Sequence, residues 1–562
     1  TEAQWSLLEQ LPALLQVAYA QLRVIFAERG VTDHTEVNTA AGMALGSDDS
    51  PTDLALALDY HLRHILVDEF QDTSRTQFDL LRRLTAGWQP ADGHSFFAVG
   101  DPMQSIYRFR QADVSLFIEA RDRGLGDLPL DSLVLKTNFR SAAQVISWVN
   151  DTFSAVFPPR DDCDRGAVSY AAATPFHADA PHGGVDIHPL FDEDSDAEAR
   201  LAADLTDTAE EEGCETVAVL ARSRTHLHAI AAVLSSRGKA FQAVEVQVLG
   251  ERLAVRELRS LTRALLLPDD RAAWLAVLRA PWCGLTLADL TTLVGDDRKT
   301  PVTRLLADPD RLARLSDDGA RRAQRVRDVM QEAIGNRRRD SLRRAVEATW
   351  LALGGPACLR SSADLAAAHS YLDLVEALES ASDLPLPGRL DESLDKLFAP
   401  PDPEAPETIQ LMTVHKAKGL EFDTVILPGL GRQPRSDDRD LVQWLEWEGD
   451  DGLPHFVVAP IAETDAGDDP LERFLRTAER TKQELEVCRL LYVAATRARK
   501  RLHLVGTLRG RGDPDELAPR RNTLLAPLWP VIGARYRRAM TQAAESHGED
   551  DAHTTGSVQP LI

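Results

Sequence analysis

Residues 65–73 read ILVDEFQDT, an apolar run that ends at two adjacent carboxylates, Asp68 and Glu69. A continuous apolar run is typical of a strand buried in a parallel sheet. Ligands of open α/β sheets bind just beyond the carboxyl ends of such strands. The stretch therefore predicts an α/β fold with parallel sheets, and it places Asp68 and Glu69 at the edge where ligands bind.

The acidic pair has two interpretations. In the first, one carboxylate of Asp68 and Glu69 coordinates Mg²⁺, directly or through water, and the other activates an attacking water. In the second, the two residues are an acidic pair at the N-terminus of a helix, which the helix dipole favours. A lone acidic pair after a strand favours the second interpretation, so the choice depends on the other motifs.

A P-loop, GxxxxGK[ST], would complete a nucleotide site, because its backbone amides and lysine hold the phosphates. The sequence does not contain this motif. Gly238 and Lys239 are followed by alanine, and between Lys416 and Gly419 lysine precedes glycine. The chain also opens on threonine, and we therefore expect it to be a fragment of a longer protein.

The composition indicates a globular protein. The chain has 562 residues, of which 44% are hydrophobic, and this length predicts about three domains. No apolar run approaches the roughly 18 residues that span a bilayer, and no basic stretch precedes an apolar one at the start. We therefore expect a cytoplasmic protein with no membrane partner. The five cysteines lack CxxC or histidine spacing, which indicates neither a disulfide scaffold nor a metal site.

The net charge of −25 argues against nucleic acid, because a nucleic-acid binder neutralises phosphates with lysine and arginine. Basic residues nevertheless cluster at Lys136 with Arg140, at Lys416 with Lys418, and within 489–511. An acidic exterior around a basic channel is compatible with DNA, because an enclosed groove focuses its own field.

Short apolar segments alternate with helical patterns, which predicts parallel sheets with helices on both faces. The predicted strands are Ile65 to Val67, Phe96 to Val99, Val185 to Leu190, Val217 to Leu220, Ile409 to Val414, Thr424 to Leu427 and Leu502 to Val505. The segment 268–404 breaks the alternation, since it is rich in leucine, alanine and arginine with helical periodicity. We expect it to be an inserted helical domain.

The segment 100–110 reads GDPMQSIYRFR and follows the predicted strand FFAV. Its first residues would end that strand at the same sheet edge as Asp68, where the amide of Gln104 can reach a γ-phosphate or its attacking water. Tyr107 and Phe109 flank an arginine, and aromatic faces beside cations suit stacking on unpaired bases, worth roughly 1–3 kcal/mol per base. The alternative is that both rings are ordinary core aromatics.

Three further segments follow in order: LKTNFRS at 135–141, MTVHKAKGLEF at 412–422 and RLLYVAATRAR at 489–499. Together with the two segments above, they resemble the ordered motifs of the superfamily 1 helicases of the UvrD and Rep type. The resemblance implies two RecA-like parallel-sheet domains, the first incomplete, with inserted helical domains. It also implies an ATP-dependent DNA helicase or translocase that moves 3′ to 5′, with ATP and Mg²⁺ as cofactors and single-stranded DNA in its path.

The resemblance assigns nucleotide-site roles to matching residues. Arg140 and Arg497 match arginine fingers, which stabilise the transferred phosphoryl group and are worth roughly 10³–10⁵ in rate. Phe139 matches a ring that packs near the nucleotide, and a plain core phenylalanine is the alternative. Glu421 matches the acid that contacts the ribose or nucleotide, and Gln104 completes the set.

Thr413 and His415 match positions that contact the DNA strand. A lone histidine is more often a satisfied core residue, but His415 lies inside the motif TVHKAKGLEF. Lys418 does not match a P-loop lysine, because glycine follows it. In the segment 489–501 only Arg497 has a motif role, and the other basic residues have a solvated helix face as the alternative.

Within this family, the motifs most closely resemble those of the AddA and RecB-like recombination helicases. The segments that carry this resemblance are VDEFQDTSRTQFDLL, GDPMQSIYRFRQAD and LLYVAATRA. This subgroup implies a role in double-strand break repair and recombination, action on duplex ends, and a nuclease or helicase partner subunit. Such proteins commonly carry a nuclease domain after the helicase, and no nuclease signature follows Thr507.

The resemblance also implies a division of the chain. It predicts a helical remainder of the first insert domain at 1–60, a partial first RecA-like domain at 61–155, a second RecA-like domain at 156–267 and 405–510, the inserted helical domain at 268–404, and a C-terminal tail or linker at 511–562.

A second hypothesis is a catalytically inactive, helicase-derived module that binds DNA or a partner. The five groups expected around the γ-phosphate argue against this second hypothesis, because an ATPase that has lost its activity has no physical reason to keep them all. These groups are Asp68, Glu69, Gln104, Arg140 and Arg497.

Overall fold

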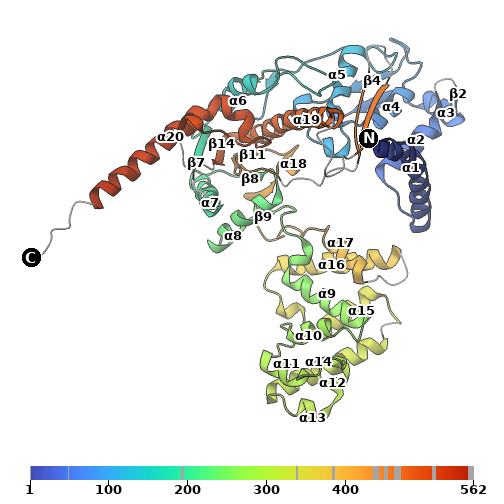
Figure 1. Ribbon diagram of the computed structural model, residues 1–562, viewed down its shortest axis with the longest axis vertical. Coiled ribbons are helices and arrows are strands. Elements are labelled where there is room, and N and C mark those ends of the chain that lie inside the picture. The colour runs from blue at the N-terminus through green and yellow to red at the C-terminus, as the bar shows by residue number, and fades with distance from the viewer. Residues whose placement is uncertain are drawn as a thin grey trace, which may run out of the picture. The chain divides into compact units, whose positions relative to one another are not determined.

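The computed structural model describes residues 2–47, 50–191, 195–336, 339–381, 387–434, 442–448, 454–460, 470–508 and 514–554. The chain divides into two compact units, one formed by 1–233 with 413–562 and the other by 234–412. Figure 1 labels the helices and strands of both units.

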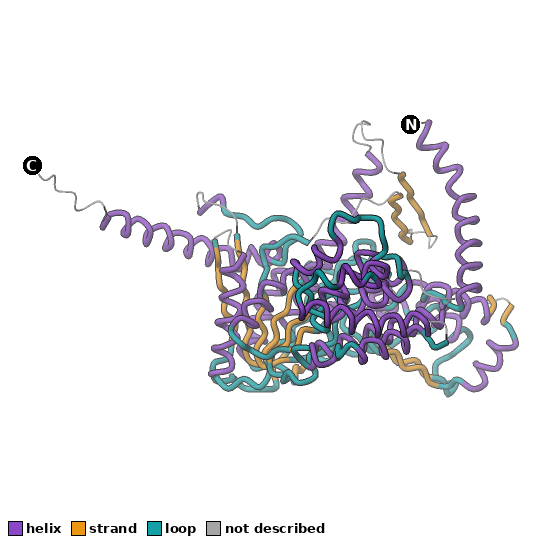
Figure 2. The backbone as a smooth tube through the Cα atoms, turned by 90° about the horizontal axis from the view of Figure 1, so that it is seen from below, coloured by secondary structure: helices purple, strands orange, loops and turns teal. Residues whose placement is uncertain are grey.

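The first unit contains a parallel sheet with the strand order β7-β14-β11-β8. Its strands are β7 (Gly184–Leu190), β8 (Val217–Ala221), β11 (Phe422–Leu427) and β14 (Ala498–Thr507). In the register, Val425 of β11 lies between Leu502 and Ala218. Every residue of β8 and β11 is buried, as the continuous apolar runs predicted. The α/β fold class expected from the sequence is thereby confirmed, and Figure 2 shows these strands side by side among helices.

Helices pack against this sheet from several parts of the chain. They are α6 (Ala143–Val156), α7 (Ser195–Glu211), α19 (Pro470–Ala495) and α20 (Leu525–Thr554). The sequence predicted a tail or linker from residue 511, and that prediction is wrong for the start of α20. Leu525, Leu528, Ile532 and Tyr536 recur every three or four residues and are buried, so this part of the helix packs as an amphipathic element.

A second, two-stranded parallel sheet pairs β3 (His64–Val67) with β4 (Ser95–Ala98). One face packs on a small core that contains Phe70, Phe78 and Leu116. On the other face, Leu66 is 75% exposed and Phe97 is 53% exposed. The sequence predicted a strand buried on both faces, and the structure corrects this, because the described residues cover only one face.

The N-terminal part of the first unit is mostly helical. The helices are α1 (Glu2–Arg29), α2 (His34–Leu45), α3 (Asp53–His61), α4 (Arg75–Leu84) and α5 (Val114–Arg123). Short strand pairs are β1 (Gly46–Ser47) with β2 (Ser50–Pro51), β5 (Thr137–Asn138) with β6 (Thr174–Pro175), and β12 (Val442–Glu448) with β13 (Pro454–Pro460). The hairpin of β12 and β13 was not predicted from the sequence.

The second unit is almost entirely helical (Figure 1). Its helices are α9 (Leu253–Leu266), α10 (Arg271–Arg279), α11 (Leu287–Val294), α12 (Val302–Ala307), α13 (Pro309–Leu312), α14 (Asp317–Asn336), α15 (Leu342–Ala352), α16 (Ser362–Ala381) and α17 (Pro387–Leu394), while α8 (His228–Ser236) crosses the boundary. Their shared core includes Trp274, Trp350 and Tyr371. Two strands, β9 (Gln242–Ala243) and β10 (Ile409–Thr413), pair in parallel. The sequence predicted the helical insertion at 268–404, and this compact unit spans 234–412.

Among the described helices, none combines the length and the apolar character needed to cross a bilayer. The five cysteines are free thiols.

Candidate functional site

The loop after β3 begins with two carboxylates, Asp68 and Glu69, and the backbone of Glu69 is strained. Asp68 Oδ1 accepts a hydrogen bond of 2.9 Å from the backbone N–H of Glu69. Glu69 itself has φ 52° and ψ 40°, a left-handed conformation that is uncommon for residues other than glycine. Such strain persists only where the surrounding structure fixes it, and it concentrates at functional sites. The position predicted for the reacting carboxylate is therefore also a strained one.

Gln71 ties this loop to the loop that follows β4. Its side-chain amide donates to the Glu69 carboxylate, and its Oε1 accepts from the backbone N–H of Asp101 at 3.0 Å. Gly100 lies against the same amide, and a Cβ added there would be 2.2 Å from Gln71 Oε1. The two strand ends therefore meet as predicted, and glycine at position 100 is what allows the contact.

We expect Gly100→Ala to lower the free energy of unfolding by about 1–3 kcal/mol, because the added methyl group overpacks the contact with Gln71. Urea unfolding of the chain, followed by circular dichroism, measures the change. Gly335→Ala is the matched control, since its Cβ would enter open space within α14. Equal stability of the two variants would contradict the prediction.

Gln104 and Arg497 meet directly. Arg497, in the turn between α19 and β14, is 1% exposed and donates from Nη2 to Gln104 Oε1 at 3.0 Å. Gln104 in turn donates to Asp101 Oδ2 at 2.8 Å. Burial, and then the nearby charge of Arg140, lowers the pKa of Arg497 to about 10, so the guanidinium stays charged at neutral pH. Burial raises the pKa of Asp101.

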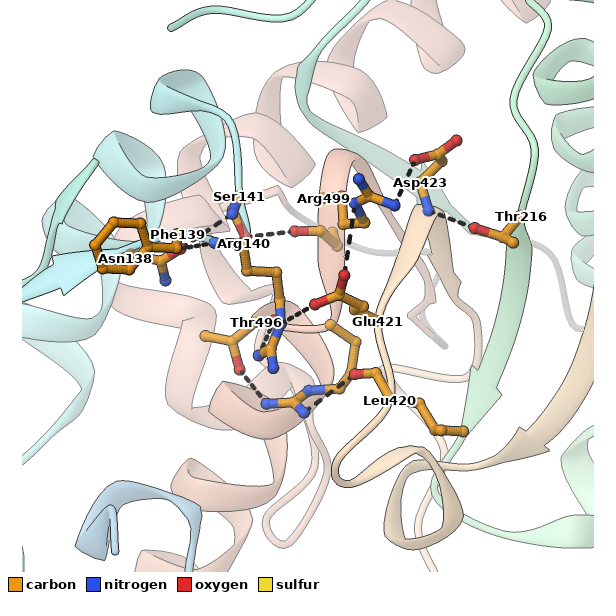
Figure 3. Close-up of polar contacts among 12 residues, drawn as sticks. Asn138, Phe139, Arg140, Ser141, Thr216, Leu420, Glu421, Asp423, Thr496 and Arg499 are labelled. Atoms are coloured by element: carbon orange, nitrogen blue, oxygen red, sulfur yellow. Dashed lines mark hydrogen bonds and ion pairs between the residues drawn. The ribbon is translucent and has the colours of Figure 1, made fainter. Parts of the chain in front are cut away.

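Arg140 forms a second group with Glu421 (Figure 3). Its Nε lies 2.9 Å from Glu421 Oε2, and its Nη1 donates to the carbonyl of Thr496 at 3.3 Å. Arg499 approaches the same carboxylate at 3.8 Å. Asn138 fixes the start of this loop by accepting from the backbone N–H of Arg140 at 2.9 Å. Glu421 thus holds Arg140 in place through a charge-assisted bond.

Phe139 projects into solvent. Its ring is 64% exposed and lies 4.8 Å, centre to centre, from the ring of Phe176, which is 63% exposed. The alternative of a plain core phenylalanine is therefore wrong for this residue. The exposed face is available to a planar ligand.

Tyr107, Phe109 and His415 form an aromatic cluster. The rings of Tyr107 and Phe109 are 5.9 Å apart, and those of Phe109 and His415 are 5.4 Å apart, both edge to face. The Tyr107 hydroxyl donates to the His415 carbonyl at 3.1 Å, while the guanidinium of Arg110 lies over both rings. Phe109 is 67% exposed, so the alternative of two core aromatics does not hold for it. Burial lowers the pKa of His415 to about 4, which leaves the imidazole neutral at pH 7.

Thr413 lies at the start of α18 (Val414–Ala417), the short helix that carries His415. Its side chain does not cap that helix, so the hydroxyl is not committed to the helix N-terminus. Thr413 and His415 therefore stand two residues apart at one end of β10.

Two buried cations were missed by the sequence analysis. Arg489 is 5% exposed and donates to the carbonyls of Ser105, at 2.7 Å, and Gly166, at 2.8 Å. A solvated helix face is therefore the wrong interpretation for Arg489. The available signal was its place among the apolar residues of RLLYVAATRAR. Lys418 was assigned to a basic cluster with Lys416 and distinguished from a P-loop lysine, yet its side chain is enclosed beside Glu69.

The metal predicted at Asp68 and Glu69 can be judged from the donor set. In the part of the chain that the structure describes, no three histidine, cysteine or acidic side chains gather as a metal cluster. One or two carboxylates are nevertheless what Mg²⁺ uses when phosphate oxygens and water supply the other ligands. Asp68 and Glu69 fit such a site, and Gln104, Arg140 and Arg497 are the side chains predicted to face the phosphates.

Two segments of the chain match known domain families. Residues 14–123 match the model of the UvrD/REP helicase N-terminal domain. Residues 393–508 match the model of the UvrD-like helicase C-terminal domain. The first match contains Asp68, Glu69 and Gln104, and the second contains Glu421 and Arg497.

Similar curated proteins are named as one of the subunits of an ATP-dependent helicase/nuclease. The protein of Exiguobacterium sibiricum is 26% identical over 551 residues, which are 86% of this chain and 43% of the relative. The protein of Lysinibacillus sphaericus is 25% identical over 641 residues, which are 98% of this chain and 50% of the relative. This chain therefore spans about half the length of the curated relatives it matches. These matches confirm the resemblance predicted from the motifs, since two segments of the chain are similar to the N-terminal and C-terminal domains of UvrD-like helicases.

Proposed function

We propose that this chain is the motor part of an ATP-dependent DNA helicase that translocates 3′ to 5′ in double-strand break repair and recombination. The observation that carries the proposal is the bond of 3.0 Å between Arg497 and Gln104. It joins the groups expected to surround a γ-phosphate, one from each of the two family-model regions.

Each nucleotide-site residue has a role in this proposal. Asp68 binds Mg²⁺, and Glu69 accepts a proton from the attacking water. Gln104 orients that water through its amide. Arg497 and Arg140 stabilise the negative charge that develops on the transferred phosphoryl group. ATP, when bound, supplies the phosphoanhydride bond whose cleavage drives movement.

Two further residues hold the nucleotide. Glu421 positions Arg140 through their bond of 2.9 Å and contacts the ribose or nucleotide. Phe139 offers its exposed ring to the nucleotide. Both roles come from the family resemblance, and both residues lie close to Arg140.

Single-stranded DNA lies along the aromatic cluster in this proposal. Phe109 and Tyr107 stack on unpaired bases, while Thr413 and His415 contact the strand. Support comes from the exposed ring of Phe109 and from the Arg110 guanidinium over both rings. Because base stacking is tolerant of sequence, little sequence preference is expected.

We further propose that the 562 residues alone hydrolyse little ATP, because their sequence has no GxxxxGK[ST] motif to hold the phosphates. A phosphate-binding segment would then lie elsewhere in a longer protein. The exposed apolar face of Leu66 and Phe97 supports this view, since buried parallel strands are normally covered on both faces.

The partner is proposed from the printed names of the relatives, which describe one subunit of a helicase/nuclease. We propose a nuclease or helicase partner subunit, duplex DNA ends as the entry point and a cytoplasmic location. The division into RecA-like and inserted domains at 61–155, 156–267 with 405–510, and 268–404 belongs to the same proposal.

The test uses the protein encoded by the complete reading frame. ATP hydrolysis should be stimulated by single-stranded DNA, and a duplex with a single-stranded tail should unwind only with ATP and Mg²⁺. The alternative, an inactive module that binds DNA or a partner, predicts DNA binding without hydrolysis. Binding without turnover in the complete protein would therefore replace the proposed function with that alternative.

A further inference from the structure

Lys418 is a buried cation outside the roles assigned above. Its side chain is 5% exposed, although lysine is rarely enclosed unless it is paired. It belongs to the loop between α18 and β11, which also carries Glu421 and directly follows the helix of His415. A buried ammonium is costly unless opposite charges compensate it.

Two carboxylates of the loop after β3 compensate this charge. Lys418 Nζ lies 3.1 Å from Glu69 Oε2 and donates a hydrogen bond to Asp72 Oδ2. Burial raises the pKa of Asp72, while Lys418 acts in the opposite direction. The ammonium therefore lies directly beside the carboxylate that the proposed function assigns to water activation.

Lys418 also touches the aromatic cluster. Its Nζ lies 5.0 Å from the centre of the Tyr107 ring, within the range of a cation–π contact. The hydroxyl of the same ring donates to the carbonyl of His415, three residues before Lys418. Tyr107 thus contacts this part of the chain at two points, one of which is the ammonium beside Glu69.

We propose that Lys418 is the positioning residue that couples DNA bound at Tyr107 to the carboxylate of Glu69. The inference rests on the proposed function and adds a route by which DNA stimulates hydrolysis. A base that stacks on Tyr107 moves the ring or covers its face, and both changes act on the ammonium. Because Lys418 is shared between Glu69 and Asp72, its displacement changes the orientation and electrostatic environment of Glu69.

A purely structural ion pair would give a different result from a coupling residue. Loss of a structural pair lowers stability and affects turnover equally with and without DNA. Loss of a coupling residue instead lowers the ratio of DNA-stimulated to unstimulated ATP hydrolysis, while the affinity for DNA is kept. The ratio is therefore the decisive measurement.

The experiment compares Lys418→Met with Lys416→Met in the complete protein. Lys416 is exposed only two residues earlier, so its replacement controls for the loss of one positive charge. We expect Lys418→Met to lower the stimulation ratio by roughly 5- to 150-fold, the usual range of coupling between two sites. The affinity for a fluorescent oligo-dT, measured by anisotropy, should change by less than about threefold in either variant, since the stacking rings stay in place.

Asp72→Asn is the second variant, used also if Lys418→Met does not fold. It removes the other carboxylate from the ammonium and should lower the stimulation ratio in the same direction. An unchanged ratio in a folded Lys418→Met or Asp72→Asn protein would overturn the coupling role. If the wild-type protein shows no DNA-stimulated hydrolysis at all, the proposed function fails instead.

Discussion

Replacing Arg497 by alanine in the complete protein is expected to lower kcat for ATP hydrolysis by roughly 10³- to 10⁵-fold. The guanidinium is buried, remains charged at neutral pH and bonds to Gln104, the amide proposed to orient the attacking water. Its loss removes a positive charge that acts in a water-poor site, where such charges stabilise a transition state most. Binding of ATP itself should be affected far less.

Steady-state hydrolysis with saturating single-stranded DNA measures this effect, and a fluorescent ATP analogue measures binding. Arg480→Ala is the matched control, because Arg480 is an exposed arginine of the neighbouring helix, α19. It should leave kcat unchanged. A loss of turnover of less than about tenfold in Arg497→Ala would be far smaller than the effect of losing an arginine finger. Such a result would show that Arg497 takes no part in the reaction.

Glu69→Gln is expected to lower kcat by roughly 10²- to 10⁴-fold, the usual contribution of a positioned general base. The substitution keeps the size of the side chain and a hydrogen-bond acceptor for Gln71, but it removes the charge that is proposed to accept the proton. DNA binding should be retained, since Glu69 lies outside the aromatic cluster and Asp72 still holds Lys418 beside Tyr107. Single-turnover hydrolysis of ATP and anisotropy with oligo-dT together measure both properties.

Glu119→Gln serves as the control for this substitution. Glu119 lies on α5 and pairs with Arg75 at 3.3 Å, a surface ion pair of the kind that contributes little to stability. The Glu119→Gln protein should hydrolyse ATP at the rate of the wild type. Near-normal turnover in Glu69→Gln would assign proton transfer to another carboxylate, and Asp101 and Asp72 are the neighbouring candidates.

The sheets were predictable where the sequence is apolar without interruption. Val217–Ala221 is apolar and buried at every position, as its sequence predicted. Phe422–Leu427 is also fully buried, but it begins two residues before the predicted strand because Asp423 interrupts the apolar pattern. The helix α20 was missed because its buried residues, such as Leu525 and Tyr536, lie at the start of an increasingly polar stretch. The hairpin of β12 and β13 was missed because acidic residues around it masked its apolar positions.

For the candidate site, the motifs placed residues in groups but did not reveal their pairings. Gln104 and Arg497 were both assigned to the γ-phosphate, and the structure joins them across 393 residues of sequence. Lys418 and Asp72 are 346 residues apart, and the two motifs that contain them do not indicate that these side chains pair. Burial of a charge depends on what the fold brings around it, and local pattern carries no information on that.

The left-handed backbone of Glu69 means that folding and chemistry favour different residues at this position. Glycine would adopt φ 52° without strain, and asparagine would do so more easily than glutamate. A redesign that optimised only the stability of the loop would therefore choose one of these and discard the carboxylate. Stabilised variants of this chain should be sought away from position 69, where the strain would be the cost of keeping the carboxylate proposed to react at the end of β3.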